Sequence, residues 1–435
     1  MKKILLLYNL DCSITLTFQT MKNVFYFFIF YYSIGFANCQ VWIHYDTTNS
    51  GISDNSITRI AIDASGNKWF GTLNHGIVKF DGTIWTNYLI LPPYYIKAIE
   101  AEGDTIWVGG VSGLARYIGG NWTFYNNSNS GLLCNDITAI AIDGFGNKWI
   151  GTTCGYSGGG LTKFDNNTWT NYYPGNSGIP FSIALSIGVD SNNNIWAGSS
   201  GLDTNASKKG LVKFDGTSWT IYDSSNSGFP DYGARSITFD TAGILWAGTG
   251  YHGIVKFDGS NWTVYDTSNT PTLQGSQYNS FSVFVDRHNK KWITGLCKLA
   301  TYDDNNWINY DSINTPLPWC SYAGMVAFDN NQNVWISANG VWVIDFTSNI
   351  SESITSDEYN LDIFPNPFSN VASIYNKLNK ELVLTIYNSL GNKVMEKLLS
   401  SDLTEINRGN LASGIYFYKT VANQKIIYKG KLIIE

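Results

Sequence analysis

A seven-fold internal repeat constrains the fold of this chain more than any other feature of its sequence. A tryptophan followed by an apolar residue, a glycine and a threonine, or by close variants, recurs at intervals of 38 to 50 residues. The seven copies begin at Trp69, Trp107, Trp149, Trp196, Trp246, Trp292 and Trp335. This spacing is too long for leucine-rich repeats and matches one four-stranded blade of a β-propeller. The sequence therefore predicts an all-β fold with seven blades.

Each repeat divides into four strand-like segments, which cover residues 57–62, 69–72, 76–80 and 85–88 in the first repeat. The third segment recurs almost unchanged, for example as Gly-Leu-Val-Lys-Phe at 210–214 and Gly-Ile-Val-Lys-Phe at 253–257. The fourth segment recurs as Trp-x-x-Tyr in the next five repeats. Residues three apart in a strand face opposite sides, so each Trp and Tyr pair is expected to pack against both neighbouring blades.

The two ends of the repeat array predict how the ring closes. The last repeat stops at residue 344 without a Trp-x-x-Tyr segment, whereas Trp42-Ile43-His44-Tyr45 stands alone before the first repeat. Pairing this segment with the last repeat would complete the seventh blade and remove an exposed sheet edge. We therefore expect a propeller over residues 40–345 that is closed by its N-terminal strand.

Composition agrees with this fold and argues against one class of partner. Aromatic residues make up 15% of the chain, and 42 glycines are present, as short strands joined by tight turns require. The net charge is −6 and the pI is about 5.3. No basic patch is visible in the sequence, so we expect no nucleic-acid partner.

These repeats resemble the two-component-regulator propeller repeats over residues 41–345, and they are similar in style to streptogramin lyase propellers. The resemblance implies a seven-bladed propeller and an extracytoplasmic sensor of a membrane histidine kinase. No kinase segment follows the repeats, and no apolar run of the ~20 residues that span a bilayer is present. We expect no transmembrane segment in the mature chain.

A second domain is predicted after a polar, Ser- and Thr-rich linker at 346–357. Residues 358–435 contain alternating apolar runs separated by turns, which favours a small Ig-like antiparallel β-sandwich. This region resembles the type A sorting domain of the type IX secretion system of Bacteroidota. The residues that carry the resemblance are Pro365, Asn366, Pro367, Gly391, Gly414, Tyr416 and Lys431. The resemblance implies the type IX machinery as a partner; the alternative is an Ig-like domain with a binding role.

The N-terminal segment 1–39 is interpreted as an extension followed by a signal peptide that starts at Met21. Lys22 precedes an apolar run at 24–37, and Ala37-Asn38-Cys39 offers a cleavage site that leaves Gln40 first in the mature chain. The alternative is a lipoprotein acylated at Cys39. Together with the sorting domain, this segment predicts passage through the periplasm and then secretion or display on the outer cell surface.

Cysteine and histidine usage limits the chemistry that the chain can perform. We predict the disulfides Cys134–Cys154 and Cys297–Cys320, with free buried thiols as the alternative. His75 and His252 occupy equivalent positions before a glycine. They are weak catalytic candidates at a pore, or else turn residues that the repeat carries along.

No metal site or cofactor is predicted from the sequence. The chain lacks a Cys-x-x-Cys motif, a Gly-x-Ser-x-Gly motif and a phosphate-binding glycine loop. Asp-rich turns such as 190–194 and 329–333 recur at one position of the repeat. This recurrence favours Asx turns over calcium loops.

The least repetitive loops give the candidates for ligand binding. Segments 152–159 and 199–209 are enlarged, and aromatic residues in nearby loops are expected to crowd the same end of the ring. These candidates are Tyr94, Tyr95, Phe181, Phe229, Tyr232, Tyr251, Trp319 and Tyr322. They either bind a ligand or plug the funnel.

The sequence thus favours a secreted or surface-attached propeller that binds a glycan or a protein. One alternative is a lyase-like or hydrolytic propeller acting at the channel mouth. The other is a structural or adhesion protein of the cell surface.

Overall fold

The computed structural model describes two compact units, Met1–Ile350 and Ser351–Glu435. The described residues are 4–7, 41–155, 158–199, 210–230, 233–250, 252–273, 281–295, 298–311, 315–317, 324–345, 362–376, 381–388, 393–401, 403–422 and 425–434. Within these ranges, no helix has the length and apolar character needed to cross a membrane.

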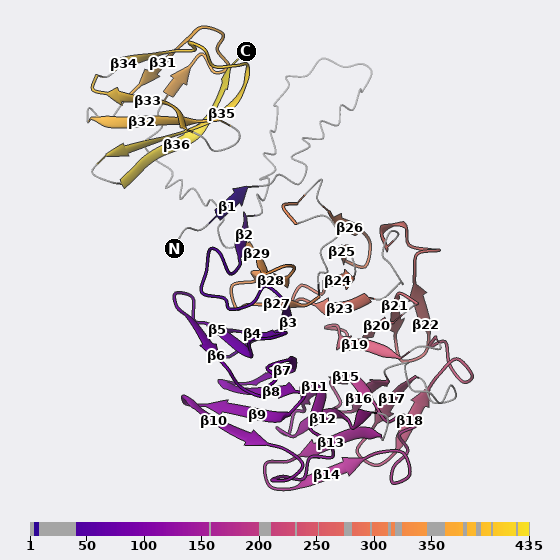
Figure 1. Ribbon diagram of the computed structural model, residues 1–435. Coiled ribbons are helices and arrows are strands. Elements are labelled where there is room, and N and C mark those ends of the chain that lie inside the picture. Colours follow the sequence, from indigo (N-terminus) through magenta and orange to yellow (C-terminus); the bar gives the residue numbers. More distant parts are fainter. Residues whose placement is uncertain are drawn as a thin grey trace, which may run out of the picture. The chain divides into compact units, whose positions relative to one another are not determined.

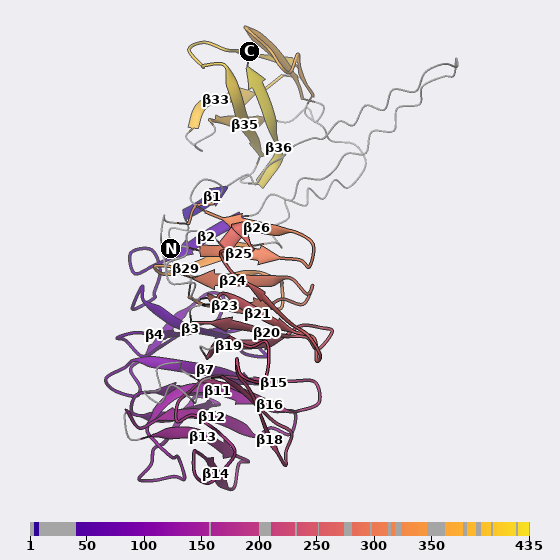
Figure 2. The ribbon, with the colours of Figure 1, turned by 90° about the vertical axis from the view of Figure 1, so that its right-hand side faces the viewer.

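In the described part of the first unit there are seven antiparallel sheets, one per repeat, so the predicted seven-bladed propeller is confirmed (Figure 1, Figure 2). Six of these sheets have four strands, and the sheet of the last repeat has a fifth strand at its edge. The first three blades are β3 (Ile57–Ile62), β4 (Lys68–Thr72), β5 (Ile77–Phe80) and β6 (Trp85–Tyr88); β7 (Ile96–Glu102), β8 (Thr105–Gly110), β9 (Gly113–Ile118) and β10 (Asn121–Tyr125); and β11 (Asp136–Ile142), β12 (Lys148–Thr153), β13 (Gly159–Phe164) and β14 (Trp169–Tyr172). In each blade the strands follow one another from the inside of the ring to its rim.

Three further blades repeat this arrangement. They are β15 (Ala184–Val189), β16 (Ile195–Ser199), β17 (Leu211–Phe214) and β18 (Trp219–Tyr222); β19 (Ala234–Phe239), β20 (Leu245–Thr249), β21 (Ile254–Phe257) and β22 (Trp262–Tyr265); and β23 (Phe281–Val285), β24 (Lys291–Gly295), β25 (Lys298–Tyr302) and β26 (Trp307–Tyr310). One short 3-10 helix, η2 (Pro271–Leu273), lies between the fifth and sixth blades.

The seventh blade is completed by the N-terminal strand, as the sequence predicts. It contains β27 (Val326–Phe328), β28 (Val334–Ser337) and β29 (Val341–Asp345), and β2 (Val41–Tyr45) is its fourth strand. In the β2–β29 register Trp42 lies opposite Ile344, and Tyr45 lies opposite Val341. A further strand, β1 (Ile4–Leu7), pairs with the other edge of β2, although it falls within the segment predicted to be absent from the mature chain.

The repeat tryptophans form the packing layer between blades, and each is at most 4% exposed. Their indole Nε1 groups donate to a carboxylate of the preceding turn, for example Trp69 to Asp63 at 2.8 Å and Trp107 to Glu102 at 3.0 Å. The lysine of the third strand lies over the ring, as Lys79 does over Trp69 at 5.3 Å. The recurrent Trp, Asp and Lys positions of the repeat are therefore scaffold.

The same bonds explain the Asp-rich turns. In the turn before β16, Asp190 Oδ1 accepts the N–H groups of Asn192 and Asn194, while Oδ2 accepts from Trp196 Nε1 at 3.0 Å. The carboxylate is thus used inside its own turn and blade. Within the described part of the chain, no group of three or more His, Cys, Asp or Glu residues is arranged to hold a metal ion.

The C-terminal unit consists of two antiparallel sheets that enclose one apolar core. One sheet contains β30 (Asp362–Phe364), β31 (Val371–Tyr375) and β34 (Leu403–Asn407). The other contains β33 (Lys393–Leu399), β32 (Leu382–Tyr387), β35 (Gly414–Ala422) and β36 (Lys425–Ile434). Ile374 from the first sheet and Leu384 and Leu432 from the second are fully buried in this core. The predicted small β-sandwich is confirmed.

Candidate functional site

The inner strands of the propeller surround a central cavity of about 870 Å³. All seven blades line it: β3, β7, β11, β15, β19 and β23 contribute side chains, and the segment before β27 closes the ring of walls. A cavity of this size lies in the range of small-ligand sites in proteins. Every repeat helps to build it.

The ring has two distinct ends, which we name the loop face and the turn face. Every inner strand starts at the loop face, where the connections between blades and the turns between second and third strands lie. The turn face carries the short hairpin turns, such as 63–67 and 81–84. Hydrogen bonds between neighbouring blades join like positions at each end, for example Thr58 to Ile96 at the loop face and Ala64 to Gly103 at the turn face.

At the loop face, hydroxyl groups at the start of the inner strands join several blades to the next. Thr58 Oγ1 donates to the carbonyl of Ile96 at 2.6 Å, and Thr138 Oγ1 donates in the same way to Ala184. Both threonines occupy a β-bulge of the inner strand. In the fourth blade the next residue, Ser186, makes the equivalent bond to Ala234 at 2.8 Å. We call these bonds the inter-blade stitches.

The stitches decide which side chains are left to face the cavity. Thr58 makes the stitch in the first blade, and Arg59 beside it lines the cavity. In the fifth blade Ser236 Oγ accepts the N–H of Val283 at 2.9 Å, and Arg235 at the bulge lines the cavity. In the third blade the residue next to the stitch is Ala139. A charge at this level is therefore not required by the fold.

Three cations and one acid lie in the cavity wall. Lys97 Nζ pairs with Asp136 of the next blade at 2.7 Å and lies 5.4 Å from the ring centre of Tyr95. Arg59 Nη1 donates to the carbonyl of Thr58 at 2.7 Å. The exposed Arg235 makes no hydrogen bond or ion pair with any residue that the structure describes. The first and fifth blades are not neighbours, so Arg59 and Arg235 project from different sides of the ring.

Glu100 is the acid of this wall, and its surroundings change its titration. The side chain is half-buried and lines the cavity. Desolvation by this burial raises the pKa of Glu100 from 4.5 to about 7, and a backbone hydrogen bond at Ala101 offsets part of the effect. The carboxyl group therefore titrates near neutral pH.

The predicted aromatic candidates fall into three groups. Tyr95 lines the cavity at the loop face and is 37% exposed, and Tyr94 beside it is half-buried with a φ of 72°. Phe181 and Phe229 are at most 1% exposed and pack in the core between blades, so they offer no surface to a ligand. Tyr232, Tyr251, Trp319 and Tyr322 lie outside the described residues.

The two histidine candidates serve matching turns in separate blades. The backbone N–H of His75 donates to Thr72 Oγ1, and that of His252 donates to Thr249 Oγ1, both at 2.9 Å. His75 Nδ1 also lies 3.3 Å from Asp54 Oδ2. Neither histidine is among the residues that line the central cavity, and their blades are the first and the fifth, so the structure does not bring them together.

Of the two predicted disulfides, one lies among the described residues. Cys134 and Cys154 form a disulfide bond with Cα atoms 5.4 Å apart. Cys134 precedes β11 and Cys154 follows β12, so the bond ties the loop-face ends of these paired strands. Cys297 and Cys320 lie outside the described residues.

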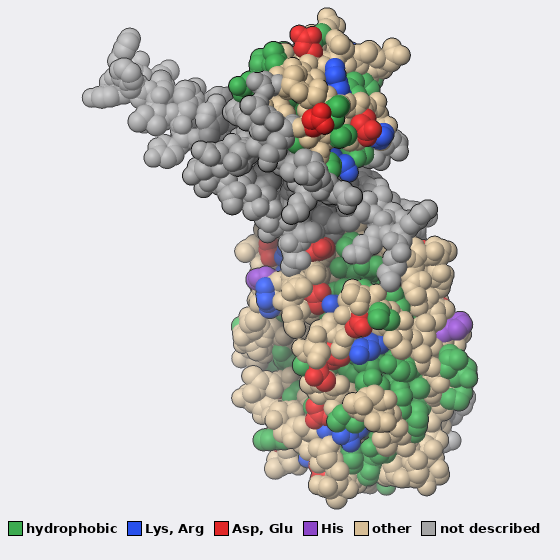
Figure 3. All heavy atoms as spheres, turned by 90° about the vertical axis from the view of Figure 1, so that its left-hand side faces the viewer, with side chains coloured by type: hydrophobic (Ala, Val, Ile, Leu, Met, Phe, Trp, Pro, Cys, Tyr) green, Lys and Arg blue, Asp and Glu red, His purple; other side chains and the backbone are tan. Residues whose placement is uncertain are grey.

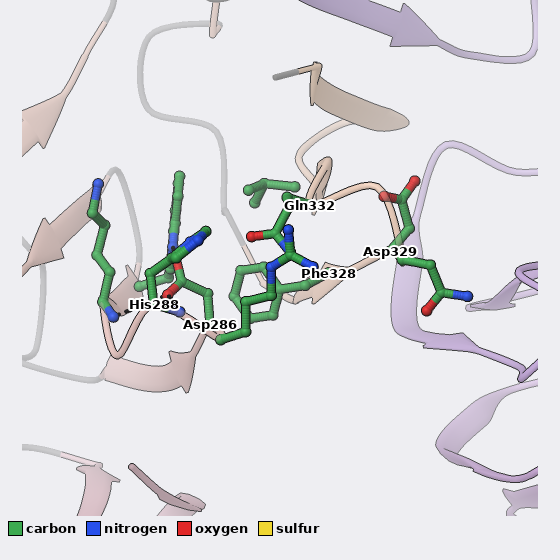
Figure 4. A pocket seen from close by; sticks show the side chains of 10 residues that line it. Asp286, His288, Phe328, Asp329 and Gln332 are labelled. Carbon is green, nitrogen blue, oxygen red and sulfur yellow. Dashed lines mark hydrogen bonds between the residues drawn. The ribbon is translucent and has the colours of Figure 1, made fainter. Parts of the chain in front are cut away.

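A second cavity, of about 480 Å³, opens on the turn face between the sixth and seventh blades. Figure 4 shows Asp286 and His288 on one blade, with Phe328, Asp329 and Gln332 on the next. At the equivalent boundary of two other blade pairs, an asparagine side chain joins the two blades. Asn193 Oδ1 accepts the N–H of Gly144, and Asn289 Oδ1 accepts the N–H of Thr241. Gln332 has the same positive φ but makes no such side-chain bond to a described residue.

The carboxylates of this second cavity already have partners. Asp286 Oδ2 accepts from Trp292 Nε1 at 3.0 Å, and Asp329 Oδ2 accepts from Trp335 Nε1 at 3.0 Å. Lys68 Nζ also lies 3.5 Å from Asp329. The cavity is therefore a seam between blades, and the central cavity is the better candidate site.

Several predicted sorting residues lie at ordered positions of the C-terminal unit. Asn366 Oδ1 accepts the N–H of Ile433 at 2.8 Å, and Tyr416 donates from its hydroxyl to Ala412 at 2.9 Å. Gly414 lies on β35 and Lys431 lies on β36, the strand paired with it, whereas Gly391 is outside the described residues. Pro365 and Pro367 are exposed and flank Asn366.

Residues 362–435 match the family described as the secretion system C-terminal sorting domain. The C-terminal unit is a sorting domain. Its presence implies that the chain interacts with the type IX secretion machinery and is delivered to the cell surface or the medium. No curated protein shows a match to the sequence.

The propeller is similar to several solved structures. It matches the extracellular domain of the hybrid two component system BT3049 from B. thetaiotaomicron, with 17% identity, a TM-score of 0.56, and coverage of 91% of this chain and 60% of that one. It also matches PorZ, a surface component of the type-IX secretion system of Porphyromonas gingivalis, with 16% identity, a TM-score of 0.55, and coverage of 91% and 63%. This chain thus spans about three fifths of both proteins. At such identities the similarity shows the fold alone.

Streptogramin B lyase is a further structural neighbour, with 16% identity, a TM-score of 0.53, and coverage of 68% of this chain and 95% of that one. The propeller repeats are therefore related in fold to sensor extracellular domains, a secretion component and an enzyme.

Sequence reasoning missed the charged residues of the cavity wall. Arg59, Lys97, Glu100 and Arg235 all lie on inner strands, where no candidate residue was predicted from the sequence. Aligned repeats carry a signal for them, because Arg59 corresponds to Ala98 and Ala139 when the strand registers are compared. A charge at a position that is small in other blades marks a departure from the scaffold.

Proposed function

We propose that this protein is a secreted ligand-binding propeller that takes the end of a glycan chain into the loop-face mouth of its central cavity. The observation that carries the proposal is a single cavity of about 870 Å³ whose mouth bears side chains that the inter-blade stitches do not use. Function on a repeat scaffold resides where residues depart from the repeat. Delivery to the cell surface brings this cavity into contact with extracellular glycans.

The shape of the site supports a chain end over a folded protein partner. A stable protein interface buries roughly 800 Å² per partner on a broad surface, whereas this site is a hollow enclosed by seven walls. The exposed ring of Tyr95 offers a flat apolar surface at the mouth, and hydroxyl groups such as those of Ser56 and Ser282 line the same cavity. Sugars present an apolar ring face together with many hydroxyl groups, which suits this combination.

Binding is also better supported than catalysis. The streptogramin B lyase similarity concerns the fold, and the two histidine candidates belong to turns of separate blades. A general acid or base must lie within hydrogen-bond reach of the reacting atom, and neither histidine lines the central cavity.

The test is binding of the purified full-length chain to a broad glycan array, with Tyr95→Ala as the variant and Phe145→Ala as the matched control. Phe145 is 82% exposed on the turn face, so its removal deletes an exposed aromatic ring at the opposite end of the ring of blades. We expect reproducible binding that falls at least tenfold in Tyr95→Ala and is unchanged in Phe145→Ala. Absence of binding to every glycan, or an equal loss in both variants, would refute the proposal.

A further inference from the structure

We infer that the ligand is an acidic saccharide, whose carboxylate or sulfate group is held in the cavity by Arg59 and Arg235. This inference rests on the function proposed above and adds the chemical class of the ligand. It is drawn from the charge of the cavity wall, from the positions of the two arginines in the repeat, and from the shape of the mouth.

The charge of the cavity wall is opposite to that of the chain. The whole sequence has a net charge of −6. The residues that line the cavity nevertheless include three cations, Arg59, Lys97 and Arg235, and one acid, Glu100. Asp136 of the next blade pairs with Lys97, whereas Arg235 makes no ion pair with a described residue and therefore contributes positive potential to the cavity. Low-dielectric walls strengthen such a potential toward an anion.

Both arginines depart from what the repeat requires. The stitch of the first blade is made by Thr58 and that of the fifth blade by Ser236, so neither arginine makes the stitch of its own blade. Arg59 Nη1 also lies 4.0 Å from Met325 Sδ in the segment before β27. The positions beside the stitch hold Ala139 in the third blade and Leu185 in the fourth. The fold needs only a small or apolar residue at these positions. A ligand that pairs with the charge explains why arginines are present.

The guanidinium group suits the proposed ligand group. Its planar fork of donors matches a carboxylate or a sulfate with two parallel hydrogen bonds, which a lysine ammonium does not provide. Arg59 and Arg235 come from the first and fifth blades, so a ligand that enters the cavity is approached from two sides. Tyr95 at the rim, with Lys97 over one face of its ring, leaves a surface for the adjoining sugar.

The experiment compares matched oligosaccharides on the full-length chain by isothermal titration calorimetry. The panel contains uronate-, sialate- and sulfate-bearing oligosaccharides, the neutral parent of each, and a hexaglutamate peptide. The variants are Arg59→Gln and Arg235→Gln, and Arg287→Gln on the turn face is the control with the same charge change. Thermal unfolding of each variant verifies that it is folded.

We expect at least one acidic oligosaccharide to bind tenfold or more tightly than its neutral parent. Each cavity variant should lower this affinity at least tenfold, while Arg287→Gln leaves it within twofold. Affinity should also fall with added salt, because an ionic contact is screened.

Three outcomes would overturn the inference, and they differ in what they say of the proposed function. Equal binding of acidic and neutral oligosaccharides refutes the acidic ligand and retains glycan binding. Binding of the peptide alone refutes a saccharide ligand in either form. Acidic-oligosaccharide binding that survives both arginine substitutions moves the anion site away from this cavity.

Discussion

At the residue scale, cationic side chains occur both in the scaffold and in the candidate site, and the position of each one decides which of these two roles it has. Lys291 is completely buried, and its Nζ lies 2.6 Å from Asp304 and 4.9 Å from the ring centre of Trp246, so its charge is used between blades. Arg235 is exposed in the cavity and has no such partner among the described residues. A buried cation needs compensation, whereas a cation in a cavity is available to a ligand.

Glu100 gives a prediction about stability and pH at this scale. Because its pKa is raised from 4.5 to about 7, the folded state binds its proton more tightly than the unfolded state does. The contribution of Glu100 to stability is therefore complete below pH 4.5 and is lost as the pH rises to about 7. We expect Glu100→Gln to raise the thermal unfolding midpoint at pH 8 and to change it little at pH 4.5, as measured by scanning calorimetry.

The charged groups that line the cavity with Glu100 are Arg59 on β3, Lys97 on β7 and Arg235 on β19. The lining residues of β11, β15, β23 and the segment before β27 carry no charge. A midpoint difference between the parent and Glu100→Gln that is equal at pH 4.5 and pH 8 would contradict the prediction.

At the element scale, the closing strand β2 carries a large share of the stability of the seventh blade. Trp42 is 1% exposed and packs with Trp342 of its own blade and Tyr310 of the sixth blade. The strand β2, which precedes the first blade in the sequence, thus packs within the seventh blade and against the sixth. The ring depends on this contact because β2 is the strand that pairs with the outer edge of β29 among the described residues.

We expect Trp42→Ala to destabilise the propeller by about 3–5 kcal/mol, the cost of removing a large buried aromatic side chain. Chemical denaturation followed by tryptophan fluorescence measures the effect. Phe145→Ala, at an exposed position, should change stability by less than about 0.5 kcal/mol. A similar effect of the two substitutions would show that closure by β2 adds little.

The disulfide between Cys134 and Cys154 gives a second prediction for an element. It joins residues that are 20 apart in sequence, and cross-linking a loop of this length stabilises a fold by roughly 3 kcal/mol through the unfolded state. The double variant Cys134→Ser/Cys154→Ser should therefore unfold at a lower temperature than the parent under oxidising conditions. The prediction fails if the two proteins have equal midpoints without reductant.

At the scale of the whole molecule, the sorting domain and the proposed binding cavity lie in separate units. The sorting domain occupies residues 362–435 and has its own buried core. The propeller has its own cavity and its own layers of packed tryptophans. On the side shown in Figure 3, Lys and Arg side chains lie singly among acidic and uncharged ones and form no extended basic patch.

Deleting residues 362–435 should abolish delivery to the cell surface and the medium, because the matched sorting domain is removed. The truncated protein is expected in the periplasm, as fractionation and immunoblotting would show. Its glycan binding should equal that of the full-length chain, since the cavity is built from the propeller alone. Surface display of the truncated protein would contradict the role of the domain in this chain.

The sequence by itself determined the number of blades, the order of their strands and the way the ring closes. These features follow from contacts within a repeat or between neighbouring repeats, so a periodic pattern of Trp, Asp, Lys and Tyr is sufficient to specify them. The sorting domain was likewise evident, because its motif residues are distributed along one contiguous segment.

Only the tertiary structure decided which residues share the cavity. Phe181 and Phe229 were predicted as ligand contacts but are buried between blades, and His75 and His252 proved to lie in turns of separate blades. Arg59 and Arg235 are 176 positions apart in the sequence and line one cavity. At the start of an inner strand, the bulge and the stitch direct one side chain to the neighbouring blade and leave the adjacent side chain to line the cavity. No local sequence pattern reveals which of the two residues lines the cavity.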